Sequence, residues 1–188
     1  WIISTADQLW RYQSASAQLS LLYQHPDYHP QLNRYATTMQ QDLNGTLWVG
    51  MQGIGLLGFD VTTLELTQFF SVDKKLRSNE VFSLLLDDAG DIWFSSRQGL
   101  ARLEPDNLQI EYFTKADGVP FHEFNDGAAV RLEDGRLIYG GMRGAVTVIP
   151  EILQNSQDNL KVVITDFAVL AGEQHAVHGF LNNREFHL

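Results

Sequence analysis

The sequence contains no cysteine, so disulfide bridges, thiolate metal sites and cysteine nucleophiles are all excluded. Long apolar runs are also missing: VFSLLL at 81–86 is far shorter than the ~20 residues of a membrane-spanning helix. No basic stretch followed by a long apolar one marks a signal peptide at the N-terminus. Basic residues are scarce, with 13 Lys and Arg against 23 Asp and Glu, and the net charge of -10 argues against binding to a nucleic-acid backbone.

The amino-acid composition is that of a folded protein. The chain has 188 residues, of which 44% are hydrophobic and 19% are charged, a balance typical of globular proteins. This length suits one domain or a short array of repeats. Because the first residues already read as a strand, we expect the chain to be part of a larger protein.

A repeat organises most of the sequence. The segments GTLWVGMQGIGLLGFD (45–60), GDIWFSSRQGLARLEP (90–105) and GRLIYGGMRGAVTVIP (135–150) begin at glycines that recur every 45 residues. WIISTADQLWRY (1–12) resembles the second of these segments, with Trp1 in line with Trp48 and Trp93. The alignment predicts about four units, at 1–33, 34–78, 79–123 and 124–150.

Each unit is predicted to be a four-stranded antiparallel meander. In the clearest unit, VFSLLLD (81–87), IWFSS (92–96), LARLE (100–104) and LQIEYF (108–113) are separated by turns rich in Gly, Asp, Asn and Pro. A four-stranded unit of about 45 residues is typical of a β-propeller blade, so the predicted fold class is all-β. Inner strands are expected near 36–42, 81–87 and 126–132, with none in the first unit. Trp1, Trp48 and Trp93 should fill the wedges between blades.

The C-terminal residues break the repeat. Residues 151–160 are predicted to be a linker, and 161–188 are β-prone without a blade motif. A sandwich domain needs ~100 residues, more than this segment has. We therefore expect 161–188 to be a truncated, β-sandwich-like strand segment or an arm that packs on the blades.

The pattern in VFSLLLDDAGDIWFSSRQGLARLEP resembles the two-component regulator propeller repeat. Residues 117–153 resemble the last blade of such propellers, although Ile138 stands where Trp is usual, and VVITDFAVL (162–170) resembles the first strand of the immunoglobulin-like domain that follows. The resemblance implies the periplasmic sensor region of a bacterial inner-membrane receptor, with a histidine kinase or a diguanylate cyclase as its cytoplasmic output domain.

No motif predicts a cofactor, a metal or a reaction. GIGLLG (53–58) matches a dinucleotide fingerprint, but a strand-like segment follows where the fingerprint requires a helix. His25 and His29 have a zinc-like spacing, but Pro26 and Pro30 make a helix there implausible. Nucleophile-elbow, HExxH and P-loop patterns are absent. The segment is therefore predicted not to be an enzyme.

Propeller geometry places one candidate ligand site. The segments that lead into the inner strands and the turns between second and third strands should share one face, where polar side chains suit a small molecule or a neutral or anionic oligosaccharide. A carbohydrate-active enzyme and a protein-docking scaffold are the alternatives. Uncovered blade faces predict self-association, or packing against other blades or the immunoglobulin-like domain. The candidate ligand-binding residues are Arg34, Tyr35, Asn79, Glu80, His122 and Asn125 before or at the inner strands, and Gln52, Arg97 and Arg143 in the turns.

Overall fold

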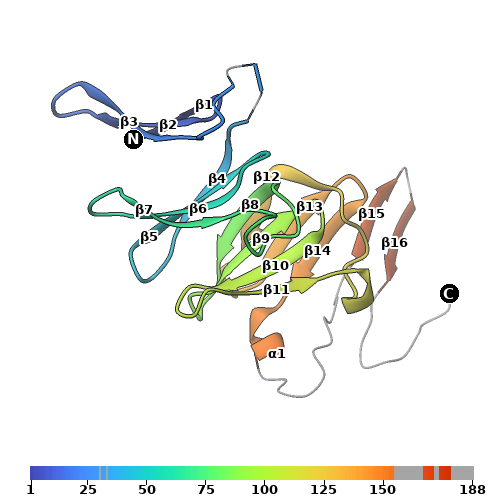
Figure 1. The fold of residues 1–188 in the computed structure, drawn as a ribbon. Coiled ribbons are helices and arrows are strands. Elements are labelled where there is room, and N and C mark those ends of the chain that lie inside the picture. The colour runs from blue at the N-terminus through green and yellow to red at the C-terminus, as the bar shows by residue number, and fades with distance from the viewer. Residues whose placement is uncertain (30, 33, 155–166, 172–173, 179–188) are drawn as a thin grey trace.

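The computed structural model describes residues 1–154 except 30 and 33, together with 167–171 and 174–178. Four antiparallel sheets follow one another along the chain (Figure 1), and the predicted all-β propeller-blade architecture is confirmed. The first sheet contains β1 (Ile2–Thr5), β2 (Gln8–Gln13) and β3 (Gln18–Gln24). The second contains β4 (Ala36–Gln41), β5 (Thr46–Met51), β6 (Gly55–Asp60) and β7 (Leu66–Phe70). The third contains β8 (Val81–Leu86), β9 (Ile92–Ser96), β10 (Gly99–Glu104) and β11 (Gln109–Phe113), and the fourth contains β12 (Phe124–Arg131), β13 (Leu137–Gly141) and β14 (Gly144–Val148).

Every sheet is a meander in which consecutive strands pair. The second and third sheets have the four strands that the sequence predicts, and β4, β8 and β12 lie at the predicted inner-strand positions. The first sheet has three strands and begins with the equivalent of a second strand, as expected. The fourth sheet departs from the prediction, since three strands are described between 124 and 148.

The remaining elements are short. A single 3-10 turn, η1 (Lys115–Asp117), precedes the fourth sheet, and α1 (Pro150–Gln154) follows it. β15 (Phe167–Ala171) and β16 (Gln174–His178) form an antiparallel pair. Most of the predicted linker, 155–160, lies outside the described residues. The assignment of 161–188 to a sandwich domain or to a packing arm stays a prediction, as do the blade boundaries.

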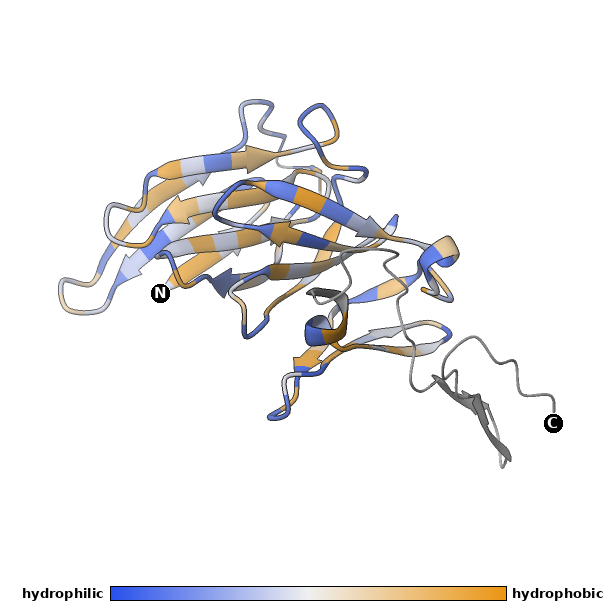
Figure 2. Ribbon diagram, turned by 90° about the horizontal axis from the view of Figure 1, so that it is seen from below, coloured by the Kyte–Doolittle hydropathy of each residue, from blue (hydrophilic) through white to orange (hydrophobic). Residues whose placement is uncertain are grey.

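Hydrophobic and polar residues alternate along several strands (Figure 2), because successive side chains of a strand point to opposite faces of the sheet. Apolar cores lie between successive sheets. Leu9 of the first sheet packs with Phe59 of the second. Trp48 of the second sheet shares a core with Phe94 of the third. Trp93 of the third sheet packs with Tyr139 of the fourth, whose hydroxyl donates a hydrogen bond to the Trp93 carbonyl oxygen at 3.0 Å. The sheets therefore stack like neighbouring blades.

The tryptophan prediction is correct for two of the three residues. Trp48 and Trp93 are 1% and 0% exposed within the cores between sheets. Trp1 is 85% exposed, and the prediction for it is wrong. The strand register places Ile2, not Trp1, at the position that Trp48 and Trp93 occupy. Alignment by residue type had shifted the first unit by one residue.

A buried carboxylate supports each of these two tryptophans. Asp42 accepts two backbone N–H bonds of its own turn through Oδ1, and its Oδ2 accepts the Trp48 indole N–H at 2.8 Å. Asp87 repeats the arrangement with Trp93, also at 2.8 Å. In the fourth sheet Leu132 takes the position of Asp87. Its backbone N–H donates to the Arg136 carbonyl oxygen, just as the Asp87 N–H donates to the Asp91 carbonyl oxygen. Ile138 replaces the tryptophan there, so both members of the pair are exchanged together.

Candidate functional site

The strand register brings the candidate segments onto one face. Each inner strand begins opposite the end of the second strand, as in the pairing of Val81 with Ser96 and of Phe124 with Gly141. The segment leading into an inner strand therefore lies beside the turn that follows the second strand. We call this surface the top face and define it as residues 34–35, 52–54, 79–80, 97–98, 122–126 and 142–143.

Two exposed ion pairs occupy equivalent places on the top face. Glu80, just before β8, binds Arg97 in the β9–β10 turn, and this hydrogen bond raises the pKa of the guanidinium. Glu123, just before β12, lies with Oε2 at 3.6 Å from Nε of Arg143 in the β13–β14 turn. The Arg97 and Arg143 side chains are 67% and 72% exposed. Both guanidinium groups are thus accessible and also partly neutralised.

Arg34, at the edge of the top face, is held by a buried carboxylate. Its side chain is 16% exposed, and Nε and NH2 each bind the fully buried Asp7 carboxylate at 2.5 Å. Asp7 also accepts the His29 backbone N–H at 2.8 Å. The hydrogen bond from Arg34 lowers the pKa of Asp7, and it raises the pKa of Arg34. The structure therefore gives Arg34 a place in the junction between the first two sheets.

Tyr35 connects the second sheet to the fourth. Its hydroxyl donates to Asp126 Oδ2 at 3.2 Å, across 91 residues of sequence. The negative charge of Asp126 raises the pKa of Tyr35. Asn125, the preceding residue, is exposed. Asp126 was missed by the sequence analysis, because no local pattern distinguishes it from other acidic residues.

The remaining candidates divide into two kinds. Asn79 has a structural contact, since its Oδ1 accepts the Val72 backbone N–H at 2.6 Å. Gln52 and His122 instead each present a buried polar atom, Oε1 and Nδ1, without a hydrogen-bond partner among the described residues. Such atoms are costly unless water or a ligand satisfies them. His122 packs closely, because a Cβ at Gly99 would come within 3.3 Å of its Nδ1.

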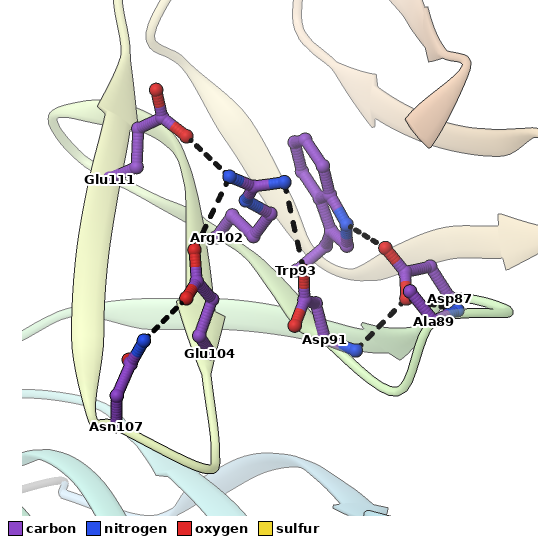
Figure 3. Close-up of polar contacts among 8 residues, drawn as sticks. All are labelled: Asp87, Ala89, Asp91, Trp93, Arg102, Glu104, Asn107 and Glu111. Atoms are coloured by element: carbon purple, nitrogen blue, oxygen red, sulfur yellow. Dashed lines mark hydrogen bonds and ion pairs between the residues drawn. The ribbon is translucent and has the colours of Figure 1, made fainter. Parts of the chain in front are cut away.

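A second polar cluster lies in the third sheet, away from the top face (Figure 3). Arg102 of β10 is 12% exposed and lies among three carboxylates. Its NH2 binds Glu111 Oε2 at 2.9 Å, and its NH1 lies 3.6 Å from Asp91 Oδ2. Glu104 is the third carboxylate, at 3.5 Å. The guanidinium carbon also lies 5.9 Å from the centre of the Trp93 ring, within reach of a cation–π contact.

Among the described residues, no three or more His, Cys, Asp or Glu side chains are placed so that they could hold a metal ion together. In the same part of the chain, no helix is long and apolar enough to cross a bilayer.

A family model described as "Two component regulator propeller" matches residues 75–98, which run into β8 and through the first turn and second strand of the third sheet. The chain carries a two-component regulator propeller repeat. A curated relative, Histidine kinase P4 of Formosa agariphila, is 29% identical over 94 residues, which make up 50% of this chain and 7% of the relative.

Solved structures share the fold. The extracellular domain of a putative hybrid two component system of B. thetaiotaomicron is 17% identical, with a TM-score of 0.64 over 98% of this chain and 29% of that chain. A second such domain from B. thetaiotaomicron is 18% identical, with a TM-score of 0.59 over 91% of this chain and 23% of that chain. Virginiamycin B lyase from Staphylococcus aureus is 11% identical, with a TM-score of 0.56 over 95% of this chain and 64% of that chain. This propeller-repeat chain thus spans less than a third of the two sensor-type domains.

Proposed function

We propose that this chain is the extracytoplasmic, ligand-sensing segment of a bacterial signal-transduction receptor. The propeller repeat and the relative named as a histidine kinase support a role in signal transduction. The extracellular domains that share the fold support an extracytoplasmic location. The periplasm as that location is part of the proposal. In this proposal a cytoplasmic output domain of the histidine kinase type lies outside the chain, which itself binds and does not catalyse.

The observation that carries the proposal is the convergence of polar side chains on the top face. The second, third and fourth sheets each contribute: Tyr35 meets Asp126, Glu80 meets Arg97, and Glu123 lies near Arg143. These groups lie far apart in sequence, and the strand register brings them to one end of the sheets. In ligand sites a small number of precisely placed polar groups fixes the orientation and the specificity of the ligand.

The ion pairing favours a neutral ligand over an anionic one. A free anion would have to compete with Glu80 and Glu123 for Arg97 and Arg143, whereas a hydroxyl can accept from a guanidinium and donate to the neighbouring carboxylate at once. A neutral oligosaccharide or another hydroxyl-rich small molecule is the ligand class that fits best.

The double substitution Arg97→Ala with Arg143→Ala tests this proposal. Exposed ion pairs contribute only ~0–1 kcal/mol each, so the melting temperature of the protein should change little. Ligand-dependent signalling in the full-length receptor should be lost, and the thermal shift that a panel of neutral glycans gives the ectodomain should vanish.

Arg136→Ala is the matched control. Arg136 is 44% exposed and pairs with Asp134 at 2.8 Å in the β12–β13 turn, at the opposite end of the strands. It should leave both signalling and the thermal shift unchanged. Retained signalling in the double variant, or a large loss of stability, would show that the top face is misassigned. Conversion of a glycan to products would favour the carbohydrate-active enzyme instead.

A further inference from the structure

Side chains of β4 hold the backbone of the neighbouring inner strand. β8 lies between β4 and β12 (Figure 1). Thr38 Oγ1 of β4 accepts the Leu84 backbone N–H of β8 at 3.0 Å. Thr37 Oγ1, also of β4, donates to the Val81 carbonyl oxygen. These bonds fix β8 against β4 at the junction between the second and third sheets.

The junction between β8 and β12 lacks the corresponding bond. Ser83 has the position on β8 that Thr38 has on β4, since the two residues pair with Ser95 and Gly50 at the same place in their second strands. The Ser83 hydroxyl is buried and has no hydrogen-bond partner among the described residues. The buried hydroxyl of Ser95, directly opposite, has none in this part of the chain either. Buried hydroxyls without partners are costly, so a rearrangement that gives Ser83 a partner would be favourable.

β12 begins differently from the two other inner strands. β4 and β8 each place two residues opposite one residue of the second strand, as an ordinary bulge does. β12 places four residues, 125–128, opposite Gly140 alone. Three of them, 125–127, are exposed at the top face, and we call them the strap. A Cβ at Gly127 would meet nothing within 4 Å, so the strap has room to move.

The strap is fixed at both ends and held in the middle. Before it, Phe124 is 6% exposed and packs in the core between the third and fourth sheets. After it, Ala129 pairs with Tyr139 of β13. Among the described residues, its one hydrogen bond to another sheet is the bond from the Tyr35 hydroxyl to Asp126, at 3.2 Å. That bond therefore sets the position of the strap on the top face.

Beyond the strap, β12 returns to the register of β8. Ala129 pairs with Tyr139 as Leu84 pairs with Phe94. Because residues at matching positions of an antiparallel ladder direct their N–H groups the same way, the Ala129 N–H faces β8 as the Leu84 N–H faces β4. Ser83 is the acceptor at the matching position of β8.

We propose that the strap has two positions and that the ligand of the top face selects between them. In the position described above, Asp126 accepts from Tyr35 and Ser83 has no partner. In the second position, Asp126 accepts from a hydroxyl of the ligand and the strap leaves Tyr35. β12 then moves toward β8, and Ser83 Oγ accepts the Ala129 N–H. The proposal rests on the proposed ligand-sensing function and adds how a ligand changes the junction between the third and fourth sheets.

The hydrogen bonds account for the order of the two positions. A bond to a carboxylate is roughly twice as strong as one between neutral groups, so without ligand the bond from Tyr35 to Asp126 outweighs the one that Ser83 could make. A ligand hydroxyl supplies Asp126 with an equivalent donor in the second position. The bond to Ser83 is then an additional gain, and the ligand binds the second position more tightly, which is what shifts the population.

Removing the Tyr35 hydroxyl tests the two positions without a ligand. In Tyr35→Phe, the Ala129 amide should exchange with solvent about fivefold more slowly than in the wild-type chain, the factor that one net hydrogen bond contributes. Amide hydrogen exchange followed by NMR measures this rate. Adding Ser83→Ala to Tyr35→Phe should remove the protection, whereas Ser83→Ala alone should leave the exchange unchanged. Tyr28→Phe, at an exposed tyrosine before β4, is the matched control and should also change nothing.

Two neutral oligosaccharides of different linkage, cellohexaose and maltohexaose, test the ligand as the trigger. A sugar that raises the melting temperature of the chain should also slow the Ala129 exchange, and the additional slowing should be absent in Ser83→Ala. Binding without any slowing at Ala129 would overturn the proposal. So would unchanged exchange in Tyr35→Phe, or slowing that persists without the Ser83 hydroxyl. If neither sugar binds, the proposed ligand class fails, and the exchange in Tyr35→Phe still decides whether the strap has two positions.

Discussion

Replacing Asp91 by Asn should make the protein more stable at neutral pH. The Asp91 side chain is 16% exposed, and burial, reinforced by the nearby charge of Asp87, raises its pKa from 3.8 to about 6. Arg102 opposes this shift but is shared with Glu104 and Glu111 (Figure 3). The folded protein therefore holds an ionised carboxylate at pH 7 in a place that disfavours its charge.

The sign and size of the effect follow from linkage. Because the pKa of Asp91 is higher in the folded state, the folded protein binds more protons, and its free energy of unfolding falls as the pH rises from about 4 to about 6. A change from 3.8 to about 6 corresponds to at most about 3 kcal/mol. Solvent screening at a partly exposed side chain reduces this to roughly 1–2 kcal/mol.

Urea unfolding between pH 4 and pH 7.5 checks this prediction. Asp91→Asn should exceed the wild-type protein in stability by roughly 1–2 kcal/mol at pH 7.5 and should match it at pH 4. Asp73→Asn, in the exposed loop after β7, is the control and should show no such pH-dependent gain. If Asp91→Asn is less stable at pH 7.5, the contact with Arg102 outweighs the cost of burial, and the reasoning is refuted.

Two further experiments test the buried polar groups. Asp7→Asn should destabilise the protein, the opposite of the effect expected for Asp91→Asn. Because Arg34 lowers the pKa of Asp7, the pair stabilises the fold at neutral pH, and the substitution should cost about 2–4 kcal/mol there. In the same urea assay this loss should shrink as the pH falls below about 4, and a loss independent of pH would contradict the prediction. The double substitution Asp87→Leu with Trp93→Ile reproduces the pair found in the fourth sheet. It should lower the free energy of unfolding by ~1–2 kcal/mol less than the sum of the two single substitutions. Strict additivity in urea unfolding would argue against coupling.

The strands were predictable because their causes are local. Turn glycines, apolar runs and the 45-residue spacing each act within one sheet, so the inner strands β4, β8 and β12 lie where the sequence places them. The error at Trp1 has a local cause as well: the turn after β1 sets the register, and residue type alone misled the alignment by one position.

The candidate site was predictable as a face but not as a set of contacts. The prediction that the segments meet at one end required only the order of strands in a meander. Which side chains meet depends on how one sheet lies against another: Arg34 reaches Asp7 across 27 residues, and Tyr35 reaches Asp126 across 91. Neither contact leaves a pattern within a single repeat. The buried Asp7 carboxylate gives Arg34 a structural contact that the sequence does not reveal.

The positions that recur between repeats and those that vary have different tasks. Asp and Trp recur at the first turn and second strand, and their side chains are buried and bonded to each other. Where one partner is exchanged, as at Leu132, the other is exchanged too, since a buried carboxylate or indole N–H without its partner is costly. The turn residues Arg97 and Arg143 reach the top face, and their side chains are 67% and 72% exposed. Because packing constrains such exposed side chains little, replacing either of them by glutamine, the residue type that the β5–β6 turn carries at Gln52, should alter binding before it alters folding.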